Sequence, residues 1–127
     1  MLPLLLPALA LVSACAGGLG AATKTPALPI EEPGDEALAA RAAQAYESRE
    51  WAAAERDYLA LSRRQAGSGA APFKLGNLYT RTGRLPEAVA AYMEATRRDP
   101  SLTRAWHNLA IVQLRLARAN LARAAEG

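Results

Sequence analysis

Small, aromatic and turn-forming residues occupy fixed positions in residues 69–102, and the pattern recurs 34 residues earlier and 34 residues later. Small side chains let two helices approach closely, and a proline in the last positions cannot continue a helix. The residues that carry the pattern are Leu75, Gly76, Tyr79, Gly83, Ala88, Tyr92, Ala95 and Pro100. Because the three units agree in phase without an insertion, the chain from residue 35 onward is predicted to be a stack of helices.

The other two units keep the pattern less completely. In the unit that starts at Asp35, Arg41 stands where the middle unit has a large apolar residue. The positions that this unit keeps are Ala42, Tyr46, Trp51, Ala54, Tyr58 and Leu61. The third unit keeps Trp106, Leu109 and Ala110 but has Ala117 at the turn position. Residues 103–125 are therefore expected to form one long helix, which packs through Ala105, Leu109, Val112, Leu116 and Ala119.

This pattern resembles that of the tetratricopeptide repeat family. The resemblance covers residues 35–127 and implies an all-α fold, a short α-solenoid of two helix hairpins and a capping helix. The first hairpin, degenerate in sequence, would span residues 35–68, the second 69–102, and the capping helix 103–127. Members of the family bind peptides or partner helices on a concave face lined by the first helix of each hairpin. The resemblance therefore implies a non-enzymatic protein-binding scaffold or assembly adaptor.

Carried over position by position, the resemblance assigns a partner-binding role to residues of the middle unit and of the last helix. They are Phe73, Lys74, Asn77, Thr80, Arg81, Arg104, His107, Asn108, Ile111, Leu114, Arg115 and Arg118. Asn77 and Asn108 match two of the five residues of the family's carboxylate clamp. Phe73 stands where the clamp has a lysine, which leaves the match incomplete.

The last helix carries a second apolar stripe, formed by Ile111, Leu114 and Leu121 with Arg118 between them. The stripe either packs within the chain or is exposed as single side chains, which is ordinary for a protein surface. Alternatively it is a docking face for a partner helix with an acidic rim, because Arg104, Arg115, Arg118 and Arg123 flank it. It could also mate with itself in a homodimer.

The N-terminal residues are predicted to be a targeting signal rather than part of the fold. Residues 1–14 are apolar and uncharged and too short to span a bilayer. Leu11, Val12, Ser13 and Ala14 precede Cys15, which resembles the lipobox of bacterial lipoproteins. The resemblance implies cleavage before Cys15 and acylation of its thiol. Cleavage after Ala16 at an ordinary Ala-x-Ala site is the alternative, and the charge-poor start would fit an initiation codon further upstream.

Residues 15–34 are rich in Gly, Ala and Pro and are expected to be a tether between lipid and domain. Ala16 after the cysteine suggests the periplasmic leaflet of the outer membrane, by resemblance to enterobacterial sorting. The sequence therefore predicts a lipid-anchored protein of a bacterial cell envelope, which could serve a pilus, secretion or export machine. A soluble, self-associating periplasmic protein and a regulatory subunit of an envelope enzyme are the alternatives.

Composition limits the other function classes. Of the 127 residues, 51% are hydrophobic but only 6% aromatic, so the apolar content is mostly Ala and Leu, which favour helices. One Cys and one His make a metal site improbable, and no catalytic constellation or cofactor motif occurs. Residues 31–57 hold eight acidic and three basic residues, whereas residues 63–127 hold eleven basic and four acidic ones. The basic residues are not interleaved with aromatic ones, which disfavours nucleic acid as a partner.

Overall fold

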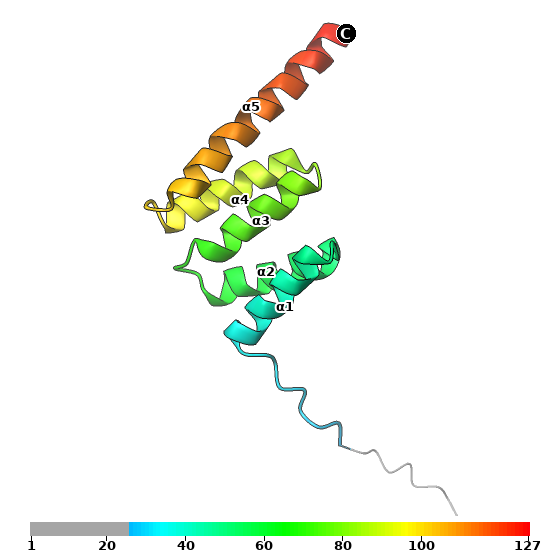
Figure 1. Cartoon of the computed structure of the whole chain (residues 1–127), viewed down its shortest axis with the longest axis vertical. Helices are drawn as coiled ribbons and strands as arrows, with labels where there is room; N and C mark the ends of the chain where they lie inside the picture. The colour runs from blue at the N-terminus through cyan, green and yellow to red at the C-terminus, as the bar shows by residue number, and fades with distance from the viewer. Residues whose placement is uncertain (1–25) are drawn as a thin grey trace, which may run out of the picture. The chain divides into compact units, whose positions relative to one another are not determined.

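Five helices account for most of the chain in the computed structural model, which describes residues 26–127 (Figure 1). They are α1 (Asp35–Glu47), α2 (Trp51–Arg64), α3 (Ala70–Arg81), α4 (Leu85–Arg98) and α5 (Thr103–Glu126). Residues 31–127, which contain all five, form one compact unit. Short turns join consecutive helices, so each helix lies beside the one before it.

The helices pack in sequence order, α1 on α2, α2 on α3, α3 on α4 and α4 on α5. The hairpins α1–α2 and α3–α4 therefore stack on each other, and α5 covers the outer side of α4 (Figure 1). This confirms the predicted fold class, all-α with two helix hairpins and a long C-terminal helix. Leu38, Leu61, Leu75, Leu78 and Val112 contribute to a continuous buried core through the stack.

The α3–α4 hairpin has a close helix crossing. A Cβ atom added at Gly76 would lie 2.5 Å from ring carbons of Tyr92, so no larger residue fits without movement. Ala88 and Ala95, on the α4 side of the crossing, are fully buried. The turn between the two helices contains Gly83 with a φ of 75°, a left-handed conformation that glycine adopts without a steric cost.

The α1–α2 hairpin has charged groups at its crossing. Asp57 of α2 is 1% exposed and accepts hydrogen bonds from Arg41 Nε at 2.6 Å and Arg41 Nη2 at 2.9 Å. Arg56 Nε donates a third hydrogen bond at 2.9 Å. The hydrogen bonds from Arg41, followed by that from Arg56, hold the pKa of Asp57 below its ordinary value despite its burial. Arg41 thus satisfies a buried carboxylate from the position where the middle unit has Leu75.

Polar contacts hold the two hairpins together. Arg98 of α4 donates to the carbonyl oxygen of Ser62 on α2 at 2.9 Å. Glu55 of α2 accepts hydrogen bonds from Tyr79 Oη and Arg84 Nη1, both at 2.8 Å. Burial and the hydrogen bond to Glu55 raise the pKa of Tyr79 to about 12. These contacts fix how α3 and α4 lie on α2, and thus where the side chains of α3 face.

On α5 the structure differs from the packing prediction at two residues. Ala105, Leu109 and Val112 are buried, but Trp106 is 51% exposed and Ala110 is exposed as well. In a complete hairpin these two positions face the second helix of their own repeat. No helix covers that side of α5 among residues 26–127, so both side chains meet solvent.

The N-terminal predictions fall outside the described residues. The predicted signal residues 1–14, Cys15 and the first part of the 15–34 tether all precede residue 26. Where the chain is described, none of the helices combines the length and the apolar character that a membrane crossing requires. The predicted division of the chain at residues 15, 35, 69 and 103 stays a prediction.

Candidate functional site

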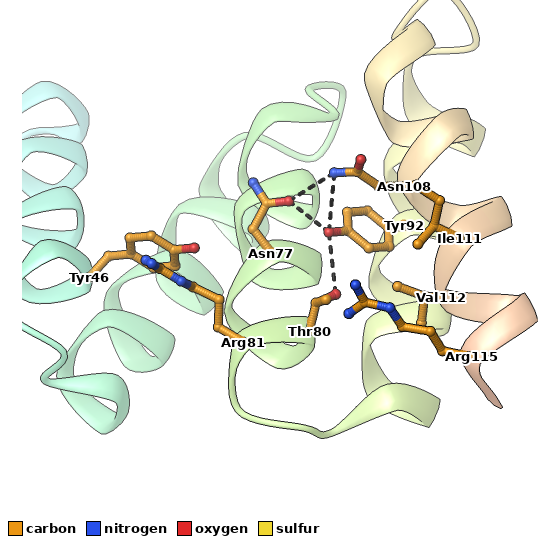
Figure 2. A pocket seen from close by; sticks show the side chains of 9 residues that line it. All are labelled: Tyr46, Asn77, Thr80, Arg81, Tyr92, Asn108, Ile111, Val112 and Arg115. Carbon is orange, nitrogen blue, oxygen red and sulfur yellow. Dashed lines mark hydrogen bonds between the residues drawn. The ribbon is translucent and has the colours of Figure 1, made fainter. Parts of the chain in front are cut away.

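A pocket of about 280 Å³ lies between α1, α3 and α5, and Figure 2 shows the side chains that line it. α1, α3 and α5 supply eight of its lining residues, and α4 supplies Tyr92. We call it the α1–α3–α5 pocket. Its lining residues are Tyr46, Asn77, Thr80, Arg81, Tyr92, Asn108, Ile111, Val112 and Arg115.

A hydrogen-bond network lies along the wall of this pocket (Figure 2). Tyr92 Oη donates to Asn77 Oδ1 at 2.7 Å, and Asn108 Nδ2 donates to the same oxygen at 3.2 Å. Asn108 Nδ2 also lies 3.4 Å from Tyr92 Oη, as does Thr80 Oγ1. The network therefore ties α3, α4 and α5 together and fixes the orientation of both asparagine amides.

The fixed amides leave two polar atoms available. Asn77 Nδ2 and Asn108 Oδ1 have no hydrogen-bond partner among residues 26–127, while their other amide atoms are engaged in the network. One is a donor and the other an acceptor, so together they match the acceptor and donor of a peptide group. An extended chain laid in the pocket could pair its backbone C=O and N–H with these two atoms.

The electrostatic character of the pocket is cationic. Arg81 and Arg115 line it, no acidic residue does, and neither arginine forms an ion pair with any described residue. The Arg81 guanidinium lies 5.3 Å from the ring centroid of Tyr46 and 6.0 Å from that of Trp51, which orients it by cation–π attraction. The pocket therefore favours an acidic or carboxylate-bearing ligand.

The pocket gathers half of the residues that the sequence assigned to partner binding. Asn77, Thr80, Arg81, Asn108, Ile111 and Arg115 line it together. The other assigned residues lie elsewhere. Lys74 lines a separate groove near the start of α3, and His107, Leu114 and Arg118 are exposed on other sides of α5.

Phe73 differs from its assigned role, because it is only 8% exposed. Its ring centroid lies 6.0 Å from that of Tyr92, and the guanidinium of Arg104 lies 5.7 Å from the Phe73 ring. Phe73 thus packs against Tyr92, which lines the pocket, and Arg104 lies beside its ring. Phe73 also lines the groove near the start of α3 that Lys74 lines, rather than the α1–α3–α5 pocket.

Three lining residues are absent from the set that the sequence assigned to binding. In the sequence pattern Tyr46 and Tyr92 are packing residues, and Val112 belongs to the inward stripe of the last helix. Each does pack, but one edge of the residue also faces the pocket. The network could have been predicted from Tyr92, because a tyrosine at a packing position buries a hydroxyl group. A buried hydroxyl requires a hydrogen-bond partner, and Asn77 is such a partner.

The chemistry of the pocket comes from uncharged polar groups and arginines. No group of three His, Cys, Asp or Glu residues among residues 26–127 could hold a metal ion. The pocket offers amides, hydroxyls and guanidinium groups, which can bind a ligand through hydrogen bonds and charge.

Two comparisons with known proteins gave a match. Residues 76–116 match the family model described as a TPR repeat. The fold is similar to that of the TPR2B domain of yeast Sti1, solved as a complex with pHsp70, with a TM-score of 0.62 and 19% identity. That likeness covers 69% of this chain and 70% of the Sti1 chain. A search of curated proteins gave no match.

Proposed function

We propose that this chain, which carries a tetratricopeptide repeat and has the corresponding fold, is a non-enzymatic protein-binding scaffold or assembly adaptor. The α1–α3–α5 pocket holds an extended, acidic segment of the partner protein. The observation that carries this proposal is the pair of oriented but unpartnered amide atoms on Asn77 and Asn108, beside two arginines that form no ion pair with residues 26–127. The amides bind the backbone of the segment, and Arg81 and Arg115 bind its carboxylates.

Photo-crosslinking in native cells tests the proposed function. A crosslinking residue at Ile111, which lines the pocket and is 38% exposed, should give one discrete adduct with a partner. The same residue at Arg63, which is exposed on α2, is the matched control and should give none. The adduct from Ile111 should disappear when Arg115→Glu reverses the charge of the pocket. Equal adducts from both sites, or an adduct insensitive to Arg115→Glu, would contradict the proposal.

A peptide titration then separates two forms of the ligand. The probe is a labelled peptide of alternating Asp and Val, prepared with either a free or an amidated C-terminus. Equal binding of both forms indicates recognition of side-chain carboxylates, whereas binding of the free form alone indicates a C-terminal carboxylate. In both cases Arg115→Glu should weaken binding by about tenfold or more, because it replaces an attraction with a repulsion.

We also propose that the scaffold is a lipoprotein of the bacterial cell envelope, anchored to the periplasmic leaflet of the outer membrane. The support is the Leu11–Ala14 pattern before Cys15. Labelled palmitate should be incorporated into the parent chain but not into a Cys15→Ser variant, and only the parent should fractionate with membranes. Absence of label from the parent would instead favour a soluble periplasmic protein.

A further inference from the structure

The outer side of α5 exposes an apolar stripe that is separate from the α1–α3–α5 pocket. Ala110, Leu114, Ala117, Leu121 and Ala124 follow one another at spacings of four and three residues, which places them on one side of a helix. All are exposed, and Leu114 and Leu121 are each 72% exposed. The same spacing on the inner side of α5 packs against α4. The outer stripe therefore has the pattern of a helix-packing seam without a described helix to pack against.

Apolar surface continues from this stripe onto α4. A groove between the two helices is lined by Trp106 and Ala110 of α5 together with Met93 of α4. Trp106 is 51% and Met93 is 53% exposed. The exposed apolar residues are thus contiguous rather than scattered, which is the arrangement found at interaction surfaces.

The charge of α5 limits what can bind there. Arg115, Arg118 and Arg123 form no ion pair with any described residue, and Glu126 is the only acidic residue of the helix. Arg118 directly follows Ala117 of the stripe and lies on its flank. Of these cations, Arg118 borders the stripe, so two stripes packed against each other would bring Arg118 of both copies into the contact, which disfavours a symmetric pair.

The complementary surface lies at the other end of the stack, on α1. Glu36, Ala40, Ala43 and Glu47 are exposed on the side of α1 that faces away from α2. Neither glutamate forms an ion pair among residues 26–127. The small alanines leave room for leucine side chains, and the two carboxylates suit arginines. The chain therefore carries an apolar, basic face at one end and a small-residue, acidic face at the other.

We propose that copies of this chain associate head to tail, with the outer stripe of α5 in one copy packed against the exposed face of α1 in the next. Arg118 then lies near Glu47, at one end of the exposed α1 face. This contact joins two different faces, so every assembly still has a free α5 stripe at one end and a free α1 face at the other. Further copies can therefore bind, and association continues beyond a dimer. Because the contact uses one helix of each copy and includes an exposed ion pair, assembly should be concentration-dependent and weakened by salt.

Sedimentation velocity of the full chain over a concentration series tests this inference. The parent should form a series of species beyond the dimer, and high ionic strength should reduce them. Arg118→Glu and Glu47→Arg should each weaken self-association by about tenfold or more. An equimolar mixture of the two variants should associate again, because each variant keeps one intact face that meets the intact face of the other. Arg123→Glu, on the other side of the same helix, is the matched control and should behave like the parent.

Other outcomes overturn the proposal. A parent that stays monomeric at every concentration excludes it, and so does assembly that stops at a dimer and is strengthened by Arg118→Glu, which is the result expected of a symmetric α5 pair. An equal loss with Arg123→Glu shows that net charge alone matters. Leu121→Asp places a charge in the stripe and should abolish assembly. Because residue 121 is exposed, the thermal unfolding midpoint should not change.

Discussion

The hairpins α1–α2 and α3–α4 have the same architecture but are held together by different interactions. In α3–α4, Gly76 allows the ring of Tyr92 to contact the helix backbone, and the hydroxyl of Tyr92 bonds to uncharged side chains of α3. In α1–α2, the equivalent of Gly76 is the buried Ala42, and the ion pair between Arg41 and Asp57 lies beside it. A sequence that departs from the repeat pattern can thus keep the fold when the departures compensate each other.

The turns of the two hairpins differ in the same way. The middle residue of the turn has a positive φ in both, 75° at Gly83 and 59° at Arg49. Glycine adopts this conformation freely, whereas arginine adopts it at a cost in free energy. The first hairpin therefore contains both a buried charge and a strained turn. Its stability should depend on pH and on the turn residue in a way that the stability of the second hairpin does not.

The largest expected effect is at the crossing of α3 and α4. Ala88→Leu should lower the free energy of unfolding by about 3 kcal/mol or more, because Ala88 has no exposed surface and the added atoms must displace the helices. Urea unfolding measures this change. Ala90→Leu, at an exposed position of the same helix, is the control and should change stability by less than about 0.5 kcal/mol. If both variants unfold like the parent, Ala88 does not lie at the crossing and the register of α4 on α3 is wrong.

A single methyl group at Gly76 should be the next largest effect. Gly76→Ala should destabilise the domain by about 2 kcal/mol, although alanine normally favours a helix by about 1 kcal/mol. The reason is the contact of 2.5 Å between the new Cβ and the Tyr92 ring. The reverse change in the first hairpin, Ala42→Gly, should cost about 1 kcal/mol from helix propensity alone. Stabilisation by Gly76→Ala would show that the ring of Tyr92 can move away from α3 at little cost.

The sequence predicted the helices well because their signal is local. Helix propensity and the turn positions act over a few residues, and the 34-residue recurrence repeats these local signals in the correct order. The partnership of Arg41 with Asp57 could not be predicted in this way, since it depends on where two helices cross. The sequence analysis assigned Trp106 to packing for a similar reason. The pattern predicts the position of a residue within a repeat, but it does not predict whether a second helix covers that position.

The candidate site was predictable only in part. Asn77 and Asn108 were found from their positions in the repeat, but their hydrogen bonds to each other and to Tyr92 depend on the packing of three helices. Phe73 was assigned to binding because position alone does not reveal that its ring is buried against Tyr92. Repeat position therefore indicates which face a side chain lies on, while the contacts of that face decide which side chains remain available.

The charged crossing should make the first hairpin sensitive to acid. Asp57→Asn should cost about 2 kcal/mol at neutral pH, because it removes a buried carboxylate that accepts three hydrogen bonds from arginines. Folding lowers the pKa of Asp57, so its contribution to stability is complete well above the ordinary carboxyl pKa, about 3.9. That contribution is then lost as the pH falls through and below that value.

Thermal unfolding as a function of pH tests this prediction. The difference in midpoint between the parent and Asp57→Asn should shrink as the pH falls from neutral to below about 4. Glu94, whose pKa is lowered to about 2 by Arg97 and Arg98, is the control carboxylate in the second hairpin. It lies at the surface, so Glu94→Gln should leave the midpoint nearly unchanged at neutral pH. A pH-independent difference for Asp57→Asn would contradict the proposed role of its charge.

The smallest expected effect is a gain in stability at the strained turn. Arg49→Gly should stabilise the domain by about 1 kcal/mol, because glycine accepts the φ of 59° without the steric cost that arginine bears. Urea unfolding of Arg49→Ala separates this cause from a change in charge, since alanine removes the charge but keeps the strain. Gly83→Ala in the second hairpin should lower the free energy of unfolding by about as much as Arg49→Gly raises it. If Arg49→Ala is as stabilising as Arg49→Gly, the arginine side chain rather than the backbone strain lowers the stability of the first hairpin.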